Sequence, residues 1–180
     1  VESALIGEKI YVPGGKLANG DFTNILEIYD PRRDIWMQGA PLPRSISAYA
    51  LADYEGKLFM FGGWDGVNVL DDLIIYDPEQ DQWDYGTPMS AKKMNAEALA
   101  VMDNIIVLGG SNESGNLTEA QIYYPSRDFS DEYPWERFIN LPNEIRKFCA
   151  AGISESIYLF EESSGENVLK ENQGYQLIND

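Results

Sequence analysis

The sequence of 180 residues contains no histidine. Without an imidazole the chain cannot build a Ser-His-Asp triad, and it lacks the side chain that most often holds zinc, copper or haem. Any catalysis would have to rely on carboxylates, Tyr, Lys or Arg. We therefore expect no metal site and no cofactor.

Positive charge is also scarce, since 13 Lys and Arg stand against 30 Asp and Glu, for a net charge of −17. Such a chain repels the phosphates of nucleic acids and anionic lipid surfaces. Long apolar runs are missing too, so no segment is expected to enter a membrane. The hydrophobic fraction of 44% is nevertheless ordinary for a globular protein and predicts a folded chain of about one domain.

Cys149 is the only cysteine, so it has no partner for a disulfide within the chain. Its apolar neighbours predict a small buried side chain. The chain begins at Val1 without a basic and apolar leader, which we interpret as a processed product or an excised piece. The compartment stays open. We favour an extracellular or cell-envelope protein, with a cytoplasmic adaptor as the alternative.

Against these absences stands an internal repeat, in which a hydrophobic run ends in two glycines and is followed by a tyrosine and a tryptophan. Gly62 recurs as Gly109, 47 positions later, and Trp83 recurs as Trp135 after 52 positions, which places an insertion of five residues in the third copy. A fourth copy has Glu161-Glu162 in place of the glycines. The repeat positions are Gly14, Gly15, Gly62, Gly63, Gly109 and Gly110; Tyr29, Tyr76 and Tyr123; and Trp36, Trp83 and Trp135.

Each period predicts four short antiparallel strands, because β-branched and aromatic runs are broken every eight to twelve residues by Gly, Pro, Asn and Asp. In the second copy we expect these strands at residues 45–53, 57–63, 71–77 and 82–86. The first strand is rich in alanine, which suits an inner strand near a crowded axis. A four-stranded sheet that buries both faces against similar neighbours is a propeller blade.

The repeat resembles the Kelch repeat over essentially the whole chain. The resemblance implies an all-β, Kelch-type β-propeller with blades of four antiparallel strands. About four blades are expected, at residues 1–40, 41–87, 88–140 and 141–180, with the last one incomplete. Kelch propellers mostly have six or seven blades, so the resemblance implies a part of such a ring. The remaining blades or a second chain would then be needed to close it.

The repeated glycines and aromatic residues are expected to be structural. Each glycine pair lies between two strands and not at the start of a helix, so it does not form a phosphate-binding loop. Crowding by a neighbouring blade, or a positive φ, explains such positions better. The tyrosines and tryptophans are expected to pack between blades.

Function on this scaffold is expected on the loops of one face. Basic residues recur there before successive inner strands, and they would either form a cationic rim or simply lie in solvent. The resemblance adds that Kelch-domain adaptors bind acidic peptides through arginines on these loops. Trp64 has no counterpart in the other copies and would supply an apolar anchor. The candidate binding residues are Arg44, Trp64, Asp65, Lys92, Lys93, Asn112 and Arg146.

The sequence therefore predicts a non-catalytic module that binds a protein or peptide, and a cationic rim would favour an acidic one. The alternative is a carbohydrate-binding or sugar-processing propeller that resembles sialic acid mutarotase. In that case Trp64 would stack on a sugar and Glu97, a charge within an Ala-rich inner strand, would act as acid or base. A purely structural spacer is a third class.

Overall fold

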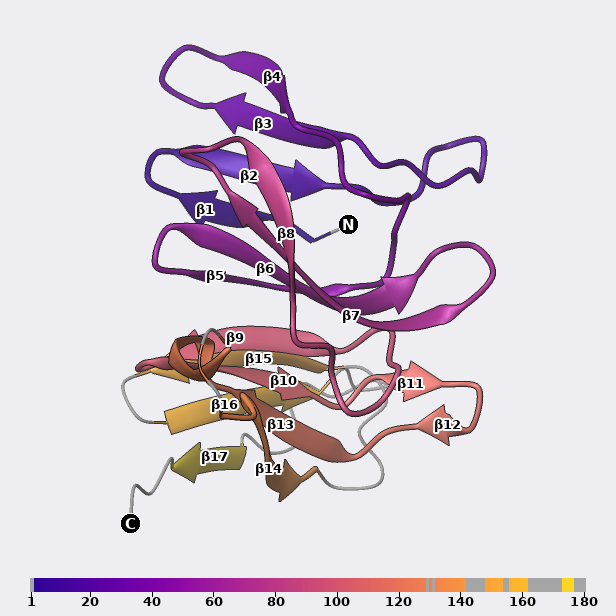
Figure 1. Cartoon of the computed structure of the whole chain (residues 1–180), viewed down its shortest axis with the longest axis vertical. Coiled ribbons are helices and arrows are strands. Elements are labelled where there is room, and N and C mark those ends of the chain that lie inside the picture. Colours follow the sequence, from indigo (N-terminus) through magenta and orange to yellow (C-terminus); the bar gives the residue numbers. More distant parts are fainter. Residues whose placement is uncertain are drawn as a thin grey trace, which may run out of the picture.

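The computed structural model describes residues 2–128, 130, 132–141, 148–153, 156–161 and 173–176. Over these residues the chain forms antiparallel sheets stacked one beside the next (Figure 1). Helix is limited, in this part of the chain, to one 3-10 turn, η1 (Pro125–Arg127). The described residues include no helix that is long and apolar enough to cross a membrane.

Four sheets, called blades 1 to 4 here, follow one another along the sequence. Blade 1 contains β1 (Ala4–Ile6), β2 (Lys9–Pro13), β3 (Leu26–Asp30) and β4 (Ile35–Gly39), and blade 2 contains β5 (Ala50–Tyr54), β6 (Lys57–Trp64), β7 (Val69–Asp77) and β8 (Gln82–Gly86). Blade 3 contains β9 (Glu97–Val101), β10 (Asn104–Leu108), β13 (Glu119–Tyr123) and β14 (Trp135–Asn140), with a small hairpin of β11 (Ser111–Asn112) and β12 (Gly115–Asn116) between β10 and β13. Blade 4 contains β15 (Phe148–Ile153), β16 (Ser156–Glu161) and β17 (Gln173–Gln176). The predicted all-β architecture of four-stranded antiparallel blades is confirmed.

The first strand of blade 2 is shorter than its sequence predicted. It begins at Ala50 rather than at residue 45 because Ala48 has a φ of 54°, in the left-handed region, which interrupts an extended strand. In contrast, β7 begins two residues earlier than expected, because Val69 pairs with Trp64 across the loop that joins β6 and β7. The predicted edge strand at residues 82–86 is confirmed.

The blades pack through apolar layers that alternate with the sheets. In blade 2, Tyr76 lies between Leu58 and Trp83 in one row across the strands, and this row packs against blade 1. In blade 3, Tyr123 and Trp135 occupy the same places and pack against Phe61 of blade 2 at ring distances of 6.0 and 5.7 Å. The same aromatic row thus forms the contact with the preceding blade at both of these junctions.

A set of three hydrogen bonds, called the clasp here, ties blade 2 to blade 1. Trp83 Nε1 donates to the carbonyl of Ala40 at 2.8 Å, and the Ala40 N–H donates to Asp81 Oδ1 at 2.7 Å. The Tyr76 hydroxyl donates to the same carboxylate oxygen at 2.6 Å and holds it in place. The side chains of Trp83 and Asp81 in blade 2 therefore form hydrogen bonds with both the C=O and the N–H of Ala40, which follows β4 of blade 1.

The clasp recurs between blades 3 and 2. Trp135 Nε1 donates to the carbonyl of Thr87 at 2.9 Å, and the Thr87 N–H donates to Asp128 Oδ1 at 3.0 Å. The Tyr123 hydroxyl donates to Asp128 Oδ2 at 2.7 Å. The inter-blade role predicted for these repeat aromatics is confirmed at both junctions.

Trp36 departs from that prediction, since 59% of its surface is exposed. It pairs with Tyr29 in the aromatic row of blade 1, as Trp83 pairs with Tyr76 in blade 2. The opposite face of blade 1, with Tyr11 and Ile28, is the one that packs on blade 2. No described blade covers the face with Trp36, which explains its exposure.

The double glycines have the structural origin that the repeat indicates. All six adopt positive φ, for example 60° at Gly62 and 105° at Gly63. A Cβ placed on Gly62 would lie 2.2 Å from the carbonyl oxygen of Lys93. The Gly63 N–H donates to that same carbonyl at 2.8 Å, so the close approach is part of the contact between blades 2 and 3.

Cys149 is exposed, so its predicted burial is wrong. It lies on β15, where alternate side chains point to opposite faces of the sheet. Its neighbour Ala150 packs toward the core between blades 3 and 4, which leaves Cys149 on the other face.

Candidate functional site

A pocket of about 430 Å³ opens on the loop face, where the chain leads into the inner strands. Its walls come from the segments that precede β1, β5 and β9 and from the residues that follow β2. The lining residues are Glu2, Gly15, Lys16, Ser47, Ala48, Tyr49 and Asn95. One acid, one lysine, two hydroxyls and one amide thus meet around a small hollow on the face where the repeat predicted function.

Two left-handed residues shape the wall of this pocket. Ala48 and Asn95 occupy equivalent positions in blades 2 and 3, and both have a φ of 54°. The Asn95 N–H donates to the carbonyl of Ala48 at 2.7 Å, which links the segments that lead into β5 and β9. A non-glycine residue in this region is strained, so the surrounding sheets hold the main chain in a fixed shape.

Burial changes the acidity of Glu97, near the pocket. Desolvation, with a smaller contribution from the charge of Glu2, raises the pKa of Glu97 to about 7. Glu97 pairs with Leu108 as Ala50 pairs with Phe61, so a carboxylate replaces a buried alanine at this level of the inner strands. A carboxyl group with such a pKa changes its charge near neutral pH.

The cation predicted at Arg44 lies on the loop face but is already paired. Its guanidinium is 3.2 Å from Asp72 Oδ2, and both side chains are partly buried. A hydrogen bond with Tyr85 raises the pKa of Arg44, and the charges of Asp72 and Asp65 act in the same direction. Arg44 therefore contributes less free positive charge than the sequence indicates.

Trp64 and Asp65 both help to build their own loop. Trp64 is the last residue of β6, is partly buried, and exchanges two backbone hydrogen bonds with Ser47 at 2.7 and 3.0 Å. Asp65 Oδ1 accepts from the N–H groups of Val67 and Asn68 at 2.8 and 2.7 Å, which lowers the pKa of Asp65. Trp64 is therefore only partly exposed, and its main chain is bonded to Ser47, which lines the pocket.

Lys93 does not lie on the surface, contrary to its predicted place in a cationic rim. Only 1% of its surface is exposed, and desolvation lowers its pKa to about 8. One repeat earlier the same position is Ile46, which is fully buried. The position belongs to the core between blades, where the chain buries a lysine in place of an isoleucine.

Replacing Lys93 with methionine is expected to stabilise the protein at pH 7 by about 2 kcal/mol, because a desolvated charge disappears from the core. The folded protein binds the Lys93 proton less tightly than the unfolded chain does. Stability should therefore rise as the pH increases from about 8 toward the ordinary pKa of lysine, and Lys93→Met should lose this rise. Urea unfolding of both proteins between pH 7 and 10 measures the difference. A destabilised variant with an unchanged pH profile would show that other interactions offset the cost of burying the charge of Lys93.

The remaining predicted residues divide between the surface and the loops. Lys92 is exposed, and its carbonyl accepts from Asn112 Nδ2 at 3.3 Å. Asn112 Oδ1 accepts from the Ser114 N–H at 2.8 Å, so this amide is used to fold the β11–β12 hairpin. Arg146 lies outside the described residues. Lys92 is thus the one predicted cation of this set that the described structure leaves exposed without an ion pair.

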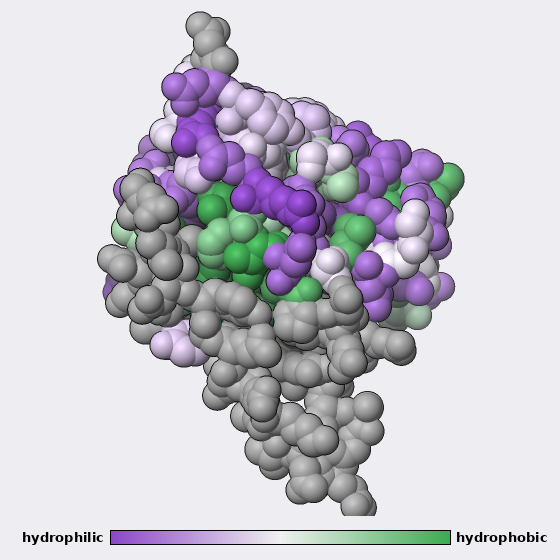
Figure 2. All heavy atoms as spheres, turned by 90° about the horizontal axis from the view of Figure 1, so that it is seen from below, coloured by the Kyte–Doolittle hydropathy of each residue, from purple (hydrophilic) through white to green (hydrophobic). Residues whose placement is uncertain are grey.

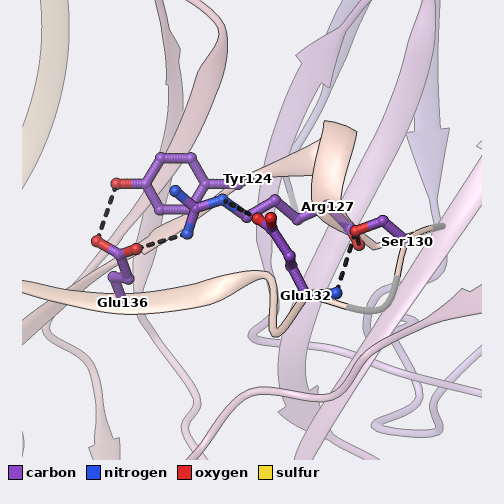
Figure 3. A network of polar contacts seen from close by, with 5 residues as sticks. All are labelled: Tyr124, Arg127, Ser130, Glu132 and Glu136. Atoms are coloured by element: carbon purple, nitrogen blue, oxygen red, sulfur yellow. Dashed lines mark hydrogen bonds and ion pairs between the residues drawn. The ribbon is translucent and has the colours of Figure 1, made fainter.

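The five-residue insertion of blade 3 forms a separate polar network (Figure 3). The guanidinium of Arg127 lies 3.8 Å from the centre of the Tyr124 ring and forms ion pairs with Glu132 and Glu136. The Tyr124 hydroxyl donates to Glu136 Oε2 at 3.2 Å. Arg127 is fully engaged here, so we assign this network to the folding of the insertion.

Sequence reasoning missed most of the pocket. Lys16 follows the first glycine pair as Trp64 follows the second, so its place on the loop face was readable from the repeat. Ser47, Tyr49 and Asn95 gave no comparable signal, because their convergence depends on how neighbouring blades pack. Among the described residues, no group of three or more Cys, Asp or Glu side chains is arranged to hold a metal ion.

Comparison with known proteins supports the repeat assignment. The Kelch motif matches residues 1–43 and 51–90. Human Kelch repeat and BTB domain-containing protein 12 is 32% identical over 72% of the chain, and Kelch-like protein terF of Aspergillus terreus is 28% identical over 97% of it. The chain belongs to the Kelch-repeat family.

The comparisons also show which fold the chain resembles and how much of each relative's length it spans. A solved structure titled "Structure of YjhT" is similar to this Kelch chain, with a TM-score of 0.73 and 17% sequence identity. The superposition covers 88% of the Kelch chain and 57% of the solved chain. That likeness concerns the fold. The aligned part spans 24% of Kelch repeat and BTB domain-containing protein 12, 41% of terF and 6% of alpha-scruin of Limulus polyphemus. The Kelch chain thus spans less than half the length of these relatives.

Proposed function

We propose that this Kelch chain is a non-catalytic binding module that receives a protein or peptide segment on its loop face. The observation that carries the proposal is the pocket between the segments that lead into β1, β5 and β9. Its walls are held by left-handed main chain, so the site exists before a ligand arrives and little conformational entropy is lost on binding.

Charge supports an acidic segment as the ligand. Lys16 lines the pocket and Lys92 lies exposed on the same loop face. On the side of the molecule seen from below, the described surface is hydrophilic around a smaller hydrophobic area (Figure 2). In a chain with 30 acidic residues, Lys16 in the pocket wall, which also contains the acid Glu2, and Lys92 elsewhere on the loop face would orient a carboxylate.

The test is a phage-displayed library of random 12-residue peptides panned on the immobilised protein. Wild type is expected to enrich peptides with Asp or Glu. The double variant Lys16→Glu, Lys92→Glu should bind the best enriched peptide at least about tenfold more weakly, since two attractive charges become repulsive. Fluorescence anisotropy with that labelled peptide gives the dissociation constants.

Lys9→Glu is the matched control, because Lys9 is an exposed lysine at the start of β2, beside the β1–β2 turn at the opposite end of the strands. Its affinity should stay within about twofold of wild type. The control changes the net charge by −2 and the double variant by −4. A loss of binding free energy in the control of about half that in the double variant would therefore mean that only net charge matters. Binding that neither change affects would place the ligand away from the loop face.

A second candidate function, sugar processing, is favoured by Glu97 alone, whose raised pKa of about 7 suits an acid or base. In that case the protein should accelerate exchange between the anomers of N-acetylneuraminic acid, measured by NMR, and Glu97→Gln should reduce the acceleration by about 100-fold. The binding module predicts no acceleration and unchanged peptide affinity in Glu97→Gln.

A further inference from the structure

The pocket on the loop face contains two opposite charges that do not pair with each other. Glu2 and Lys16 both line it, yet neither side chain forms an ion pair with any described residue. Ser47 and Asn95 add a hydroxyl and an amide to the same wall, and within the described part of the chain only their main-chain groups are hydrogen-bonded. Opposite charges that share a hollow but stay apart leave room for a ligand between them.

The negative charge lies close to the inner strands. The Tyr49 hydroxyl donates to the carbonyl of Glu2 at 3.5 Å, which places this residue beside the segment that leads into β5. Desolvation is the larger cause of the raised pKa values of Tyr49 and Glu97, and the charge of Glu2 raises both further. The carboxylate of Glu2 therefore acts on the groups around the pocket and not only on solvent.

The positive charge is placed by the loop between β2 and β3. Lys16 pairs with Phe22 across this loop, and its ammonium nitrogen lies 5.9 Å from the centre of the Phe22 ring. The loop between β6 and β7 comes close to the same ring, since a Cβ on Gly66 would lie 3.3 Å from it. Both loops are on the right in Figure 1. Attraction to the Phe22 ring thus gives the ammonium group a preferred position in the wall.

We propose that the pocket recognises a segment with two opposite charges close together, in which an Asp or Glu meets Lys16 and a Lys or Arg meets Glu2. This inference rests on the proposed function and names the class of its ligand. A segment with a carboxylate alone would bring that charge near Glu2 without compensation, whereas a neighbouring cation removes the repulsion.

The size of the pocket limits the spacing of the two charges. A hollow of about 430 Å³, treated as a cube, has an edge of about 7.5 Å, which two or three extended residues span. The acidic and the basic residue of the ligand should therefore lie within about three positions of each other.

The test is a double-mutant cycle on a peptide enriched by the wild-type protein, synthesised with acetylated and amidated ends so that only side chains carry charge. In a second peptide Gln replaces the Lys or Arg. By fluorescence anisotropy, Glu2→Gln should weaken binding of the parent peptide at least about fivefold. The second peptide should bind Glu2→Gln as tightly as wild type or more tightly, because its acidic residue is no longer repelled by Glu2.

Glu55→Gln is the matched control, because Glu55 is an exposed glutamate in the β5–β6 turn, at the opposite end of the strands from the loop face (Figure 1). It should change the affinity of the parent peptide by less than about twofold. Enriched acidic peptides that lack Lys and Arg would overturn this inference and leave the proposed function standing. So would an effect of Glu2→Gln that is the same for both peptides. If no acidic peptide is enriched, or if Lys16→Glu, Lys92→Glu binds as tightly as wild type, the proposed function and this inference are both wrong.

Discussion

Gly62→Ala is expected to destabilise the protein by about 4 kcal/mol, a large part of the stability of a typical domain. The new Cβ would lie 2.2 Å from the Lys93 carbonyl oxygen and 3.0 Å from that of Leu70. Both atoms are main chain and cannot rotate away. The substitution also forces alanine to a φ of 60°, and it disturbs the hydrogen bond from Gly63 to Lys93.

Gly56→Ala separates the two effects of this change. Gly56 also has a positive φ, of 76°, but a Cβ there would meet nothing within 4 Å. Its cost should be about 1 kcal/mol, from backbone strain alone. Urea denaturation followed by circular dichroism gives both values. Similar values for the two variants would mean that the blades move apart easily and that the glycine pair does not fix their contact.

Trp135→Ala is expected to cost about 4 kcal/mol, as for other buried tryptophans. Trp135 is 5% exposed, its ring lies tilted against that of Tyr123 with the centroids 4.9 Å apart, and its indole N–H donates to the carbonyl of Thr87. Its removal would leave a cavity between blades 2 and 3 and an unsatisfied carbonyl.

Trp36→Ala removes the equivalent side chain of blade 1 and serves as the comparison. Because Trp36 is 59% exposed and its indole bonds to no described residue, its loss should cost about 1 kcal/mol or less. Thermal unfolding at several protein concentrations measures both variants. Equal costs would show that the face of blade 1 is already covered in solution.

The repeat made much of the fold predictable. Two glycines, a tyrosine and a tryptophan recur at a nearly constant spacing, and they occupy equivalent positions in the strands of blades 1 to 3. The boundary of β5 could not be predicted in this way, because the left-handed turn at Ala48 leaves no mark in an Ala-rich segment. The predicted exposure of Lys93 was wrong for a different reason. Its position is set by packing that buries Ile46 in the previous copy, while its charge alone suggests solvent.

The sequence by itself determined the class of fold, the order of the blades and the chemistry that a chain without histidine cannot perform. These follow from local periodicity and composition, which do not depend on distant contacts. Only the tertiary structure decided that Arg44 is paired with Asp72, that Lys93 is buried and that Trp36 is exposed. Each of these depends on which blade lies beside which, because a side chain in a propeller meets its neighbours across two separate sheets. The clasp between blades is visible only when residues about 40 positions apart are brought within hydrogen-bond distance.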